Sequence, residues 1–453
     1  MVEKVIWQNG GADAEAEKLK RKVLNSENAL DLGGRIYYVS SNGDDANDAS
    51  TPDKPIKSFE KLSEIPLEKG DTVLFERGSF YRIAETYELV GGVNYGAYGK
   101  GEKPVFSGSL RDYADSSLWS LSEEQNIWQM PLNTKGIKSA SLITFNNEEY
   151  VGVWKETKAE VLKDGDFYHD TEKGILYLYF KDANPGDYFD NIEIATTNTM
   201  FISKFTENIN VDNLSIKHVT RSALLFGECN KISVTNCVIS WMGGAVWNHR
   251  PEGTVRYGNA VEFWYQCHDI VTKGCWMYQI FDAAVTFQGS GDKGAASFEN
   301  IHFDENLIEY CSMNIEYWVG NGASADCAHI KDITYKGDIV RFSGYGWSGI
   351  QRPDKGSQAL LLGWNRKYDD LENFVISDCI FDCADGHMIF MYGSPDQKGL
   401  YFENNSYYQK TSPCTKNAFA VVRDVSKTAT NQEDLQEAIL MFDTNPKLVK
   451  WLG

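Results

Sequence analysis

The sequence predicts an all-β solenoid, in which short strands stack coil upon coil, and three observations support that fold class. Short segments in which apolar and polar residues alternate recur between about residues 205 and 410. In most of them Asn, Asp or Gly follows an aligned apolar residue four positions later. Each unit is too short to bury a core alone, so the units must stack on their neighbours. The aligned apolar positions are Ile209, Ile232, Ile270, Ile301, Ile333, Phe374 and Leu400.

The alternation predicts strands, because a period of two places one side chain inward and the next outward. Val, Ile, Phe, Tyr and Thr dominate the segments, which favours strands over helices. No amphipathic helical stripe of useful length interrupts them, which argues against leucine-rich and helical repeats. Strands of successive coils that run in the same direction form a parallel β-helix.

Tight bends are predicted four residues after the aligned apolar positions. Asn, Asp and Gly suit such bends, since they tolerate left-handed backbone angles or bond their own backbone. The bend residues are Asn213, Asn236, Gly274, Gly337, Asp378 and Asn404. The fourth repeat carries Glu305 and Asn306 instead, and we expect its bend to be one residue longer.

The composition shifts along the chain and predicts five segments. Irregular spacing, scattered Trp residues and a hairpin pattern at 164–180 indicate an inserted antiparallel β-module. A helix near 431–442 is expected to cover one end of the solenoid. The segments are a helical segment (1–32), the first coils (33–109), the inserted module (110–190), the main β-helix carrying the site (191–410) and a C-terminal cap (411–453).

Charge and cysteine usage narrow the function classes. The net charge of −20 argues against nucleic acid and anionic membrane surfaces as partners. The nine cysteines form no metal-binding spacing, and Cys237, Cys275, Cys311 and Cys379 fit buried small hydrophobic positions. No Gly-rich phosphate loop precedes a helix, so no redox or nucleotide cofactor is expected. No Cys/His cluster with metal spacing occurs either, so no metal is expected. Neither a signal peptide nor a membrane-spanning apolar run is evident, which predicts a cytoplasmic protein unless the natural chain begins earlier.

A second set of strands falls late in each repeat and places two carboxylates on one outer face. With Leu224, Val261, Val285, Ile315 and Ile350 pointing inward, the next position points outward. That outward column reads Leu225, Glu262, Thr286, Glu316 and Gln351, followed by Phe390. Two positions further on come Trp264, Gln288 and Trp318. Carboxylates beside flat aromatic rings are typical of sugar chemistry, which needs acid–base groups and apolar platforms for pyranose rings.

Long loops enter the chain near this column, and loops gathered on one face of a rigid scaffold usually mark the functional face. One loop carries His249, Arg250 and Arg256, and another carries Arg352 and Asp354. Asp282 precedes the Thr286 strand and is a third carboxylate. The candidate catalytic residues are therefore Glu262, Asp282 and Glu316. The candidate substrate-binding residues are Trp264, Trp318, Gln288, Gln351, Arg352, Asp354, His249 and Arg256.

Structural readings compete with these roles. A lone outward Glu is most often simply solvated, whereas two in one column beside Trp residues are harder to explain that way. Arg352 could instead pair with Asp354 or Asp282 to hold a loop. His387 and Asp385 fit a turn better than a catalytic base.

Several runs in the chain resemble a known group of proteins. The opening pattern YYVSSNGDDANDAS…PIKSFEKL…EKGDTVLFERG resembles bacterial right-handed β-helix proteins of the pectate-lyase-like superfamily. The runs RYGNAVEFW, YQIFDAAVTFQGSGD and GYGWSGIQRPD resemble its carbohydrate-active members, which include a β-xylosidase family with an inserted β-module and a family with α-fucosidases. This resemblance implies an acidic pair among Glu262, Asp282 and Glu316. Neither a polygalacturonase pattern nor a pectate-lyase calcium cluster is evident.

Three functions remain open from the sequence. The first is a glycoside hydrolase acting on an oligosaccharide or a plant or host glycan, with one carboxyl as acid and another as base or nucleophile. Glu262 and Glu316, two rungs apart, would be about 9–10 Å apart at the backbone. Side-chain tilt would bring them toward the inverting separation, whereas Asp282 leaning toward one Glu would give a retaining pair.

The second function is a polysaccharide lyase or uronate epimerase using Arg250, Arg256, Arg352 or His249 beside a substrate carboxylate. The third is a non-catalytic glycan-binding protein, since exposed Trp residues serve binding equally well.

Overall fold

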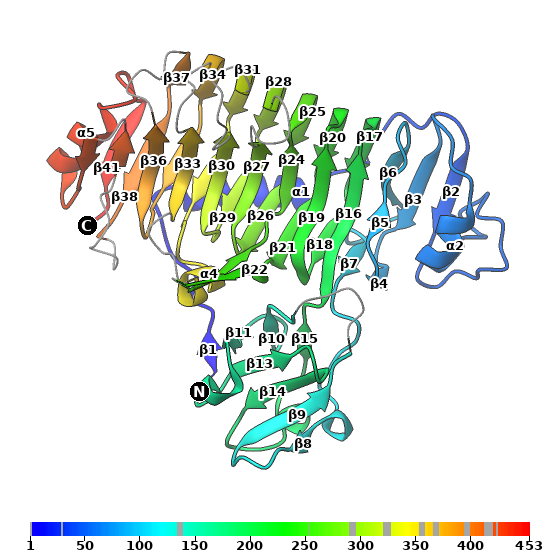
Figure 1. Ribbon diagram of the computed structural model, residues 1–453. Coiled ribbons are helices and arrows are strands. Elements are labelled where there is room, and N and C mark those ends of the chain that lie inside the picture. Colours follow the sequence, from blue (N-terminus) through cyan, green and yellow to red (C-terminus); the bar gives the residue numbers. More distant parts are fainter. Residues whose placement is uncertain are drawn as a thin grey trace.

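One repeat of the chain forms one coil of three strands, as β25 (Gln266–Lys273), β26 (Trp276–Ile280) and β27 (Ala283–Gly289) illustrate. Each strand of a coil joins a different sheet, so that successive coils build three sheets around one core (Figure 1). The computed structural model describes residues 2–28, 30–133, 139–251, 253–289, 296–319, 328–352, 358–365, 371–393, 399–411, 420–422 and 425–453.

Three ten-stranded sheets make up the solenoid, and their strands pair in parallel except at the β39–β40 end. Sheet 1 contains β2 (Ile36–Val39), β3 (Thr72–Glu76), β6 (Asn94–Tyr98), β17 (Glu207–Asp212), β20 (Asn230–Thr235), β25, β28 (Ala296–Asp304), β31 (Ala328–Lys336), β34 (Leu371–Ser377) and β37 (Leu400–Glu403). Sheet 2 contains β4 (Phe80–Arg82), β7 (Val105–Ser107), β18 (Ser215–Lys217), β21 (Val238–Met242), β26, β29 (Leu307–Glu309), β32 (Ile339–Arg341), β35 (Ile380–Asp382), β38 (Ser406–Gln409) and β41 (Leu448–Trp451). Sheet 3 contains β5 (Tyr87–Glu88), β16 (Thr197–Lys204), β19 (Val219–Gly227), β24 (Val261–Trp264), β27, β30 (Met313–Val319), β33 (Ala359–Asn365), β36 (His387–Gly393), β39 (Ala420–Val422) and β40 (Val425–Lys427).

The chain is thus an all-β parallel β-helix with an inserted antiparallel module, which confirms the predicted fold class. The aligned apolar positions form one inward column of sheet 1, because each pairs with the next from Ile209 through to Leu400. Apolar and aromatic side chains fill the interior, and rings stack from coil to coil, as Phe303 does on Tyr335. The seven cysteines that the structure describes are buried and free, as predicted.

The predicted bends after the sheet 1 strands adopt the left-handed conformation, with φ of 60° at Asn213 and 62° at Gly274. The expected longer bend in the fourth repeat is wrong. Glu305 takes φ of 53° at the same position, and β29 stays in register with β26. The buried Asn306 beside it joins two coils: its amide donates to the Thr272 carbonyl and accepts from the Cys275 N–H, both at 2.9 Å. Asn405 makes the same pair of bonds after the bend at Asn404, so an Asn after the bend does not lengthen it.

The inserted module contains two small sheets that pack on their own core. Its strands pair antiparallel except for β12 and β13, and the predicted hairpin at 164–180 is β13 and β14. The strands are β8 (Ser120–Leu121), β9 (Ile127–Pro131), β10 (Ile143–Phe145), β11 (Tyr150–Val151), β12 (Val153–Trp154), β13 (Asp166–Asp170), β14 (Ile175–Tyr179) and β15 (Ile192–Ile194). The first strand of the chain, β1 (Glu3–Lys4), joins this module by pairing with β11.

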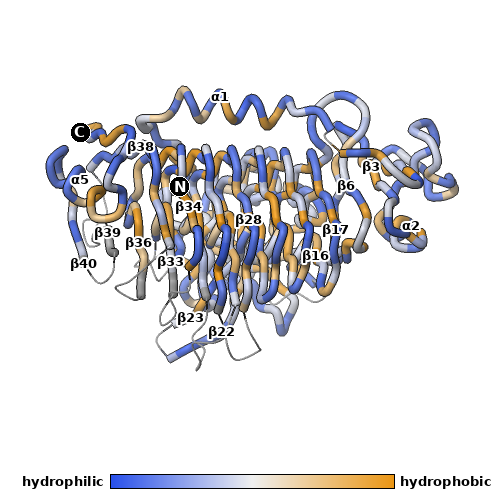
Figure 2. The backbone as a smooth tube through the Cα atoms, turned by 90° about the horizontal axis from the view of Figure 1, so that it is seen from above, coloured by the Kyte–Doolittle hydropathy of each residue, from blue (hydrophilic) through white to orange (hydrophobic). Residues whose placement is uncertain are grey.

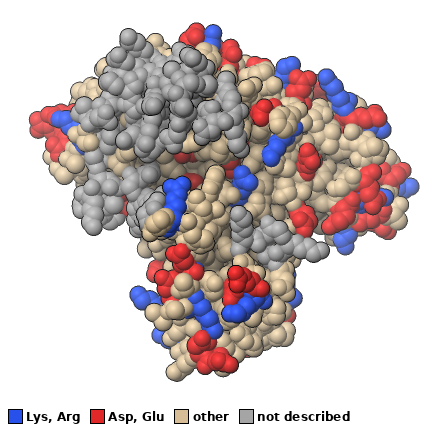
Figure 3. Space-filling model, viewed as in Figure 1, with Lys and Arg blue, Asp and Glu red and all other residues tan. Residues whose placement is uncertain are grey.

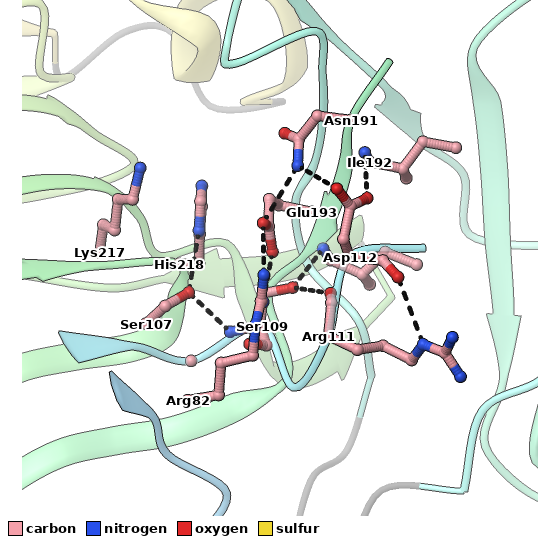
Figure 4. Close-up of polar contacts among 12 residues, drawn as sticks. Arg82, Ser107, Ser109, Arg111, Asp112, Asn191, Ile192, Glu193, Lys217 and His218 are labelled. Carbon is pink, nitrogen blue, oxygen red and sulfur yellow. Dashed lines mark hydrogen bonds and ion pairs between the residues drawn. The ribbon is translucent and has the colours of Figure 1, made fainter. Parts of the chain in front are cut away.

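A polar network joins the module to the first coils (Figure 4). Arg82 donates two hydrogen bonds to Glu193, at 2.8 and 2.9 Å, in a bidentate pair. The Ser109 hydroxyl accepts from the Ile194 N–H at 3.0 Å, and Ser107 lies 3.2 Å from Nδ1 of the buried His218. Bidentate Arg–carboxylate pairs fix orientation as well as contact, so the module is held at a defined angle.

Five helices are found in the described residues. Figure 2 shows α1 (Asp13–Leu24) running along the length of the solenoid, and its contacts with β29 place it on sheet 2. Its Ala16 and Val23 pack against Trp276, Leu307 and Ile339. The others are α2 (Phe59–Glu64), α3 (Pro185–Tyr188), α4 (Trp347–Gln351) and α5 (Gln432–Ile439), and 3₁₀ turns span Ser116–Leu118 and Lys158–Glu160. The helix expected near 431–442 is α5, which packs beside β41.

In the part of the chain that the structure describes, no helix is long and apolar enough to cross a membrane. Charged side chains of both signs are interspersed over the face in Figure 3, with acidic ones gathered toward the first coils.

Candidate active site

The predicted outward column lies on sheet 3, and its two glutamates stand on β24 and β30 with Thr286 of β27 between them. The pairing places Leu225, Glu262, Thr286, Glu316, Leu362 and Phe390 side by side across consecutive strands. Trp264, Gln288 and Trp318 form the second column, also as predicted.

Gln351 does not belong to this column, which corrects the sequence prediction. Residues 347–351 form α4, and Ile350, expected to point inward, is 45% exposed. The strand at this rung is β33, in which Leu362 takes the position beside Glu316. Leu362 is buried against Ala283 and Met313, so β33 is apolar on both faces and lacks the alternation that marks the other strands.

A cavity of about 480 Å³ opens above the two glutamates. This volume is within the usual range of small-ligand pockets. A hairpin of β22 (Ala245–Arg250) and β23 (Gly253–Tyr257) contributes one wall. The lining residues are Trp247, Arg250, Val255, Tyr257, Asn259, Glu262, Trp264, Asp282, Gln288, Met313, Glu316, Trp318, Arg352 and Leu362.

Glu316 is 8% exposed and accepts hydrogen bonds from Thr286 Oγ1 at 2.9 Å and Gln288 Nε2 at 2.5 Å. Burial, together with the negative charge of Asp282, raises the pKa of Glu316 to about 7. Its hydrogen bonds and the nearby Arg352 charge oppose this shift without cancelling it. Glu316 is therefore placed to exchange a proton near neutral pH.

Glu262 is 1% exposed and accepts from the Ser222 hydroxyl and from Trp264 Nε1, the latter at 2.5 Å. Burial raises the pKa of this carboxyl, while Arg221 and the two hydrogen bonds favour its ionised form. The two glutamates thus have similar burial and different partners.

Asp282 lies beside the glutamates and pairs with Arg352, whose Nη1 is 2.5 Å from Asp282 Oδ1. Both side chains are buried. Arg352 follows the last residue of α4, so this short helix delivers the cation to the pocket. One of the structural alternatives for Arg352, pairing with Asp282, is the arrangement observed.

Three of the predicted substrate-binding residues contact the inserted module and do not line the cavity. Arg256 is buried and donates to the Gly244 carbonyl at 2.8 Å and the Ser141 carbonyl at 2.9 Å. Gln351 donates to the Gly152 carbonyl at 2.6 Å, and His249 lies 3.2 Å from Glu156. These side chains dock α4 and the β22–β23 hairpin on the module.

Burial lowers the pKa of Arg256 to about 9, so it stays charged at neutral pH. Its guanidinium lies over the rings of Trp154 and Phe281. Asp354 lies outside the described residues. His387 is buried, and burial lowers its pKa to about 4, which favours the structural reading.

Sequence reasoning missed two aromatic residues of the cavity, Trp247 and Tyr257. Their rings meet edge to face, with centroids 5.0 Å apart, and Arg221 lies over the Tyr257 ring at 5.6 Å. A Pro-Glu-Gly turn at 251–253 is followed by the alternating run Thr-Val-Arg-Tyr at 254–257, a hairpin signal that could have found them. Among the described residues no group of three or more His, Cys, Asp or Glu side chains is arranged to hold a metal ion.

No family model matches the chain, and no curated protein matches it. Solved structures similar to it share little sequence. A glycoside hydrolase is 10% identical over 92% of this chain and 96% of its own, with a TM-score of 0.48. The xylose complex of XylC is 13% identical over 84% and 76%, with a TM-score of 0.45. Pectate lyase Pel9A is 11% identical over 88% and 82%, with a TM-score of 0.40. The parallel β-helix fold rests on the three sheets described above.

Proposed function

We propose that this protein is a glycoside hydrolase and that the cavity on sheet 3 is its active site. The observation that carries the proposal is the buried pair Glu262 and Glu316, two rungs apart in one column and facing a cavity with Trp264 and Trp318. Paired carboxyl groups across a scissile glycosidic bond are the usual machinery of such enzymes. Aromatic rings beside them supply apolar faces for pyranose rings.

Glu316 is the proposed general acid. With a pKa of about 7 it carries a proton over much of the neutral range, so it can donate that proton to the glycosidic oxygen as the bond to the anomeric carbon breaks. Asp282 supports this role, because its negative charge discourages a second negative charge on Glu316.

Glu262 is the proposed base, which takes a proton from the attacking water. Its hydrogen bonds from Ser222 and Trp264 favour the carboxylate form. Two rungs correspond to about 9–10 Å between backbones, which favours the wider separation of inverting enzymes. We therefore propose inversion at the anomeric carbon.

A panel of aryl glycosides and plant and host oligosaccharides tests the proposal, with sugar release followed by chromatography. Wild type is compared with Glu262→Gln, Asp282→Asn and Glu316→Gln. Hydrolysis that is lost in Glu262→Gln and Glu316→Gln supports the pair. The anomer formed first, read by proton NMR, decides between inversion and retention. Activity that survives both glutamate variants refutes the proposal.

A lyase is the second candidate, and one observation bears on it. Arg250 lines the cavity and its side chain is exposed, whereas Arg352 is engaged by Asp282 and Arg256 by backbone carbonyls. Arg250 is therefore the cation that would bind a substrate carboxylate in this cavity. Ultraviolet-absorbing unsaturated products that depend on Arg250 would move the function to a lyase. Binding without any product would indicate a glycan-binding protein.

A further inference from the structure

A second and larger cavity, of about 740 Å³, lies on sheet 2 beneath α1. Its walls are the face of α1 toward the sheet, the segment before that helix, and the 147–149 turn of the inserted module. Its lining shares no residue with that of the cavity on sheet 3. The two cavities therefore lie on different faces of the β-helix.

Aromatic rings form part of the wall of this cavity. Trp276 and Tyr278 stack, with centroids 4.1 Å apart and planes 18° apart. Trp7 meets Tyr310 edge to face at 4.9 Å, yet Trp7 remains 53% exposed. The Gln8 N–H donates to the Tyr310 hydroxyl at 2.7 Å, and that hydroxyl donates back to the Gln8 carbonyl at 3.2 Å. An exposed Trp is thus held in place beside a cavity, an arrangement that favours binding over packing.

Polar groups stand among the rings. Glu309 is buried and accepts from Trp276 Nε1 at 3.0 Å. Burial raises the pKa of Glu309, although the Arg341 charge opposes the shift. Arg341 Nε lies 3.9 Å from Glu309 Oε2 and, within the described part of the chain, makes no hydrogen bond. Buried polar atoms normally have partners, so this unsatisfied donor indicates a missing one.

The cavity carries charges of both signs. Every acidic side chain that lines it lies beside a basic one: Asp13 and Glu309 share Arg341, and the other pairs are Glu17 with Arg21, Glu148 with Lys217, and Glu149 with Lys4. Lys20 also lines the cavity and lies over the Trp276 ring. Because no run of one sign calls for a charged ligand, flat rings and interspersed polar groups match a neutral ligand that has both apolar faces and hydroxyls.

We propose that this cavity is a second saccharide-binding site, with Trp7 as its platform and Glu309 and Arg341 as its polar contacts. It takes a neutral sugar unit, and it binds without cleaving. The cavity on sheet 3 carries out turnover whether or not this site is filled.

The test uses the full chain carrying Glu316→Gln, which stops the proposed turnover and leaves the sheet 2 cavity intact. The probe is an array of neutral plant and host oligosaccharides, followed by calorimetry on the glycans that bind. We expect Trp7→Ala to weaken binding to a subset of them by about tenfold and to remove one of two binding sites per chain. Trp7→Phe keeps a ring and should retain most of the affinity.

Tyr401→Ala is the matched control, because Tyr401 is 51% exposed on sheet 1, away from both cavities. Glu309→Gln keeps the shape of the buried side chain and should also weaken the same subset. An array pattern that Trp7→Ala and Glu309→Gln leave unchanged overturns the proposal, and so does an array that binds nothing. Loss of binding in Trp7→Ala, with no hydrolysis by wild type, would support this site and refute the hydrolase.

Discussion

Thr286 stands between Glu262 and Glu316 in one column of sheet 3 and donates its hydroxyl to Glu316 at 2.9 Å. Glu262 instead takes its donors from Ser222 and Trp264. Both carboxyls are therefore buried, but they accept hydrogen bonds from different donors. Carboxyls whose environments differ in this way can take opposite roles in one reaction.

Replacing the proposed acid should remove activity. Glu316→Gln keeps the shape of the side chain and cannot donate a proton, so we expect turnover to fall by about 10²–10⁴-fold. Initial rates on the best substrate of the panel measure the loss. Glu305→Gln is the control, because Glu305 lies at a partly exposed bend after β28 and does not line the sheet 3 cavity. Equal rates for Glu316→Gln and wild type would contradict the proposed role.

Activity should fall as the pH rises through about 7, because Glu316 then loses its proton. A pH profile of kcat/KM for wild type checks this. An alkaline limb more than two units above neutrality would contradict the assignment of Glu316 as the acid.

The free energy of unfolding should also depend on the protonation of Glu316. The folded pKa of Glu316, about 7, exceeds its ordinary value of 4.5, so its contribution is fully present below pH 4.5 and is lost as pH rises through 7. The loss amounts to about 3 kcal/mol. Glu316→Gln cannot ionise, so we expect its melting temperature to exceed that of wild type at pH 8 and to approach it at pH 5. The same difference at both pH values would contradict this linkage.

Arg352 pairs with Asp282, and its charge also lowers the pKa of Glu316 directly. Arg352→Met leaves Asp282 buried without this cation, which should destabilise the fold by about 3 kcal/mol. It also removes a charge that lowers the pKa of Glu316, so the alkaline limb should move to higher pH. Urea unfolding and the pH profile measure the two effects. A purely structural role would lower stability and leave the limb in place.

Trp264 combines a ring with a donor, and the two functions can be separated. Trp264→Phe keeps an aromatic face but loses the N–H that bonds Glu262, which should raise the pKa of Glu262 and lower kcat more than it raises KM. Trp318→Ala removes a ring on the next-but-one strand and should chiefly raise KM. Steady-state kinetics distinguish them, and identical profiles would contradict the separation.

The repeat was readable from sequence because its signals are local and repeated. The alternation around Ile209 to Leu400 and the bend residues fixed the register of sheet 1, and the same alternation placed Glu262 and Glu316 in one column. Gln351 was placed in this column wrongly, because the alternation of apolar and polar residues is missing at that rung. β33 is covered on both faces, so it shows no alternation, while the preceding Gly-rich stretch turns into α4.

The contacts around the site could not be predicted from the sequence, because segments distant in the sequence make them. Arg256 and Gln351 were expected to meet substrate, yet they contact Ser141 and Gly152 of the inserted module, more than a hundred residues away in sequence. The burial of Glu262 and Glu316 likewise depends on the walls around the column. Local patterns carry no information about such contacts.

The pairing of β1 with β11 and the contact of Gln8 with Tyr310 have a consequence for biosynthesis. Gln8 forms a hydrogen bond with Tyr310, which lies 302 residues further along the chain, and another with Lys410, which lies 402 residues further along. At about 5–20 residues per second, synthesis takes on the order of tens of seconds to deliver those partners. The segment around Gln8 therefore docks later than the coils between it and Tyr310 can form. Coils can form one after another as the chain emerges, but the segment from β1 to α1 gains its contacts with Tyr310 and Lys410 only after those residues have been made.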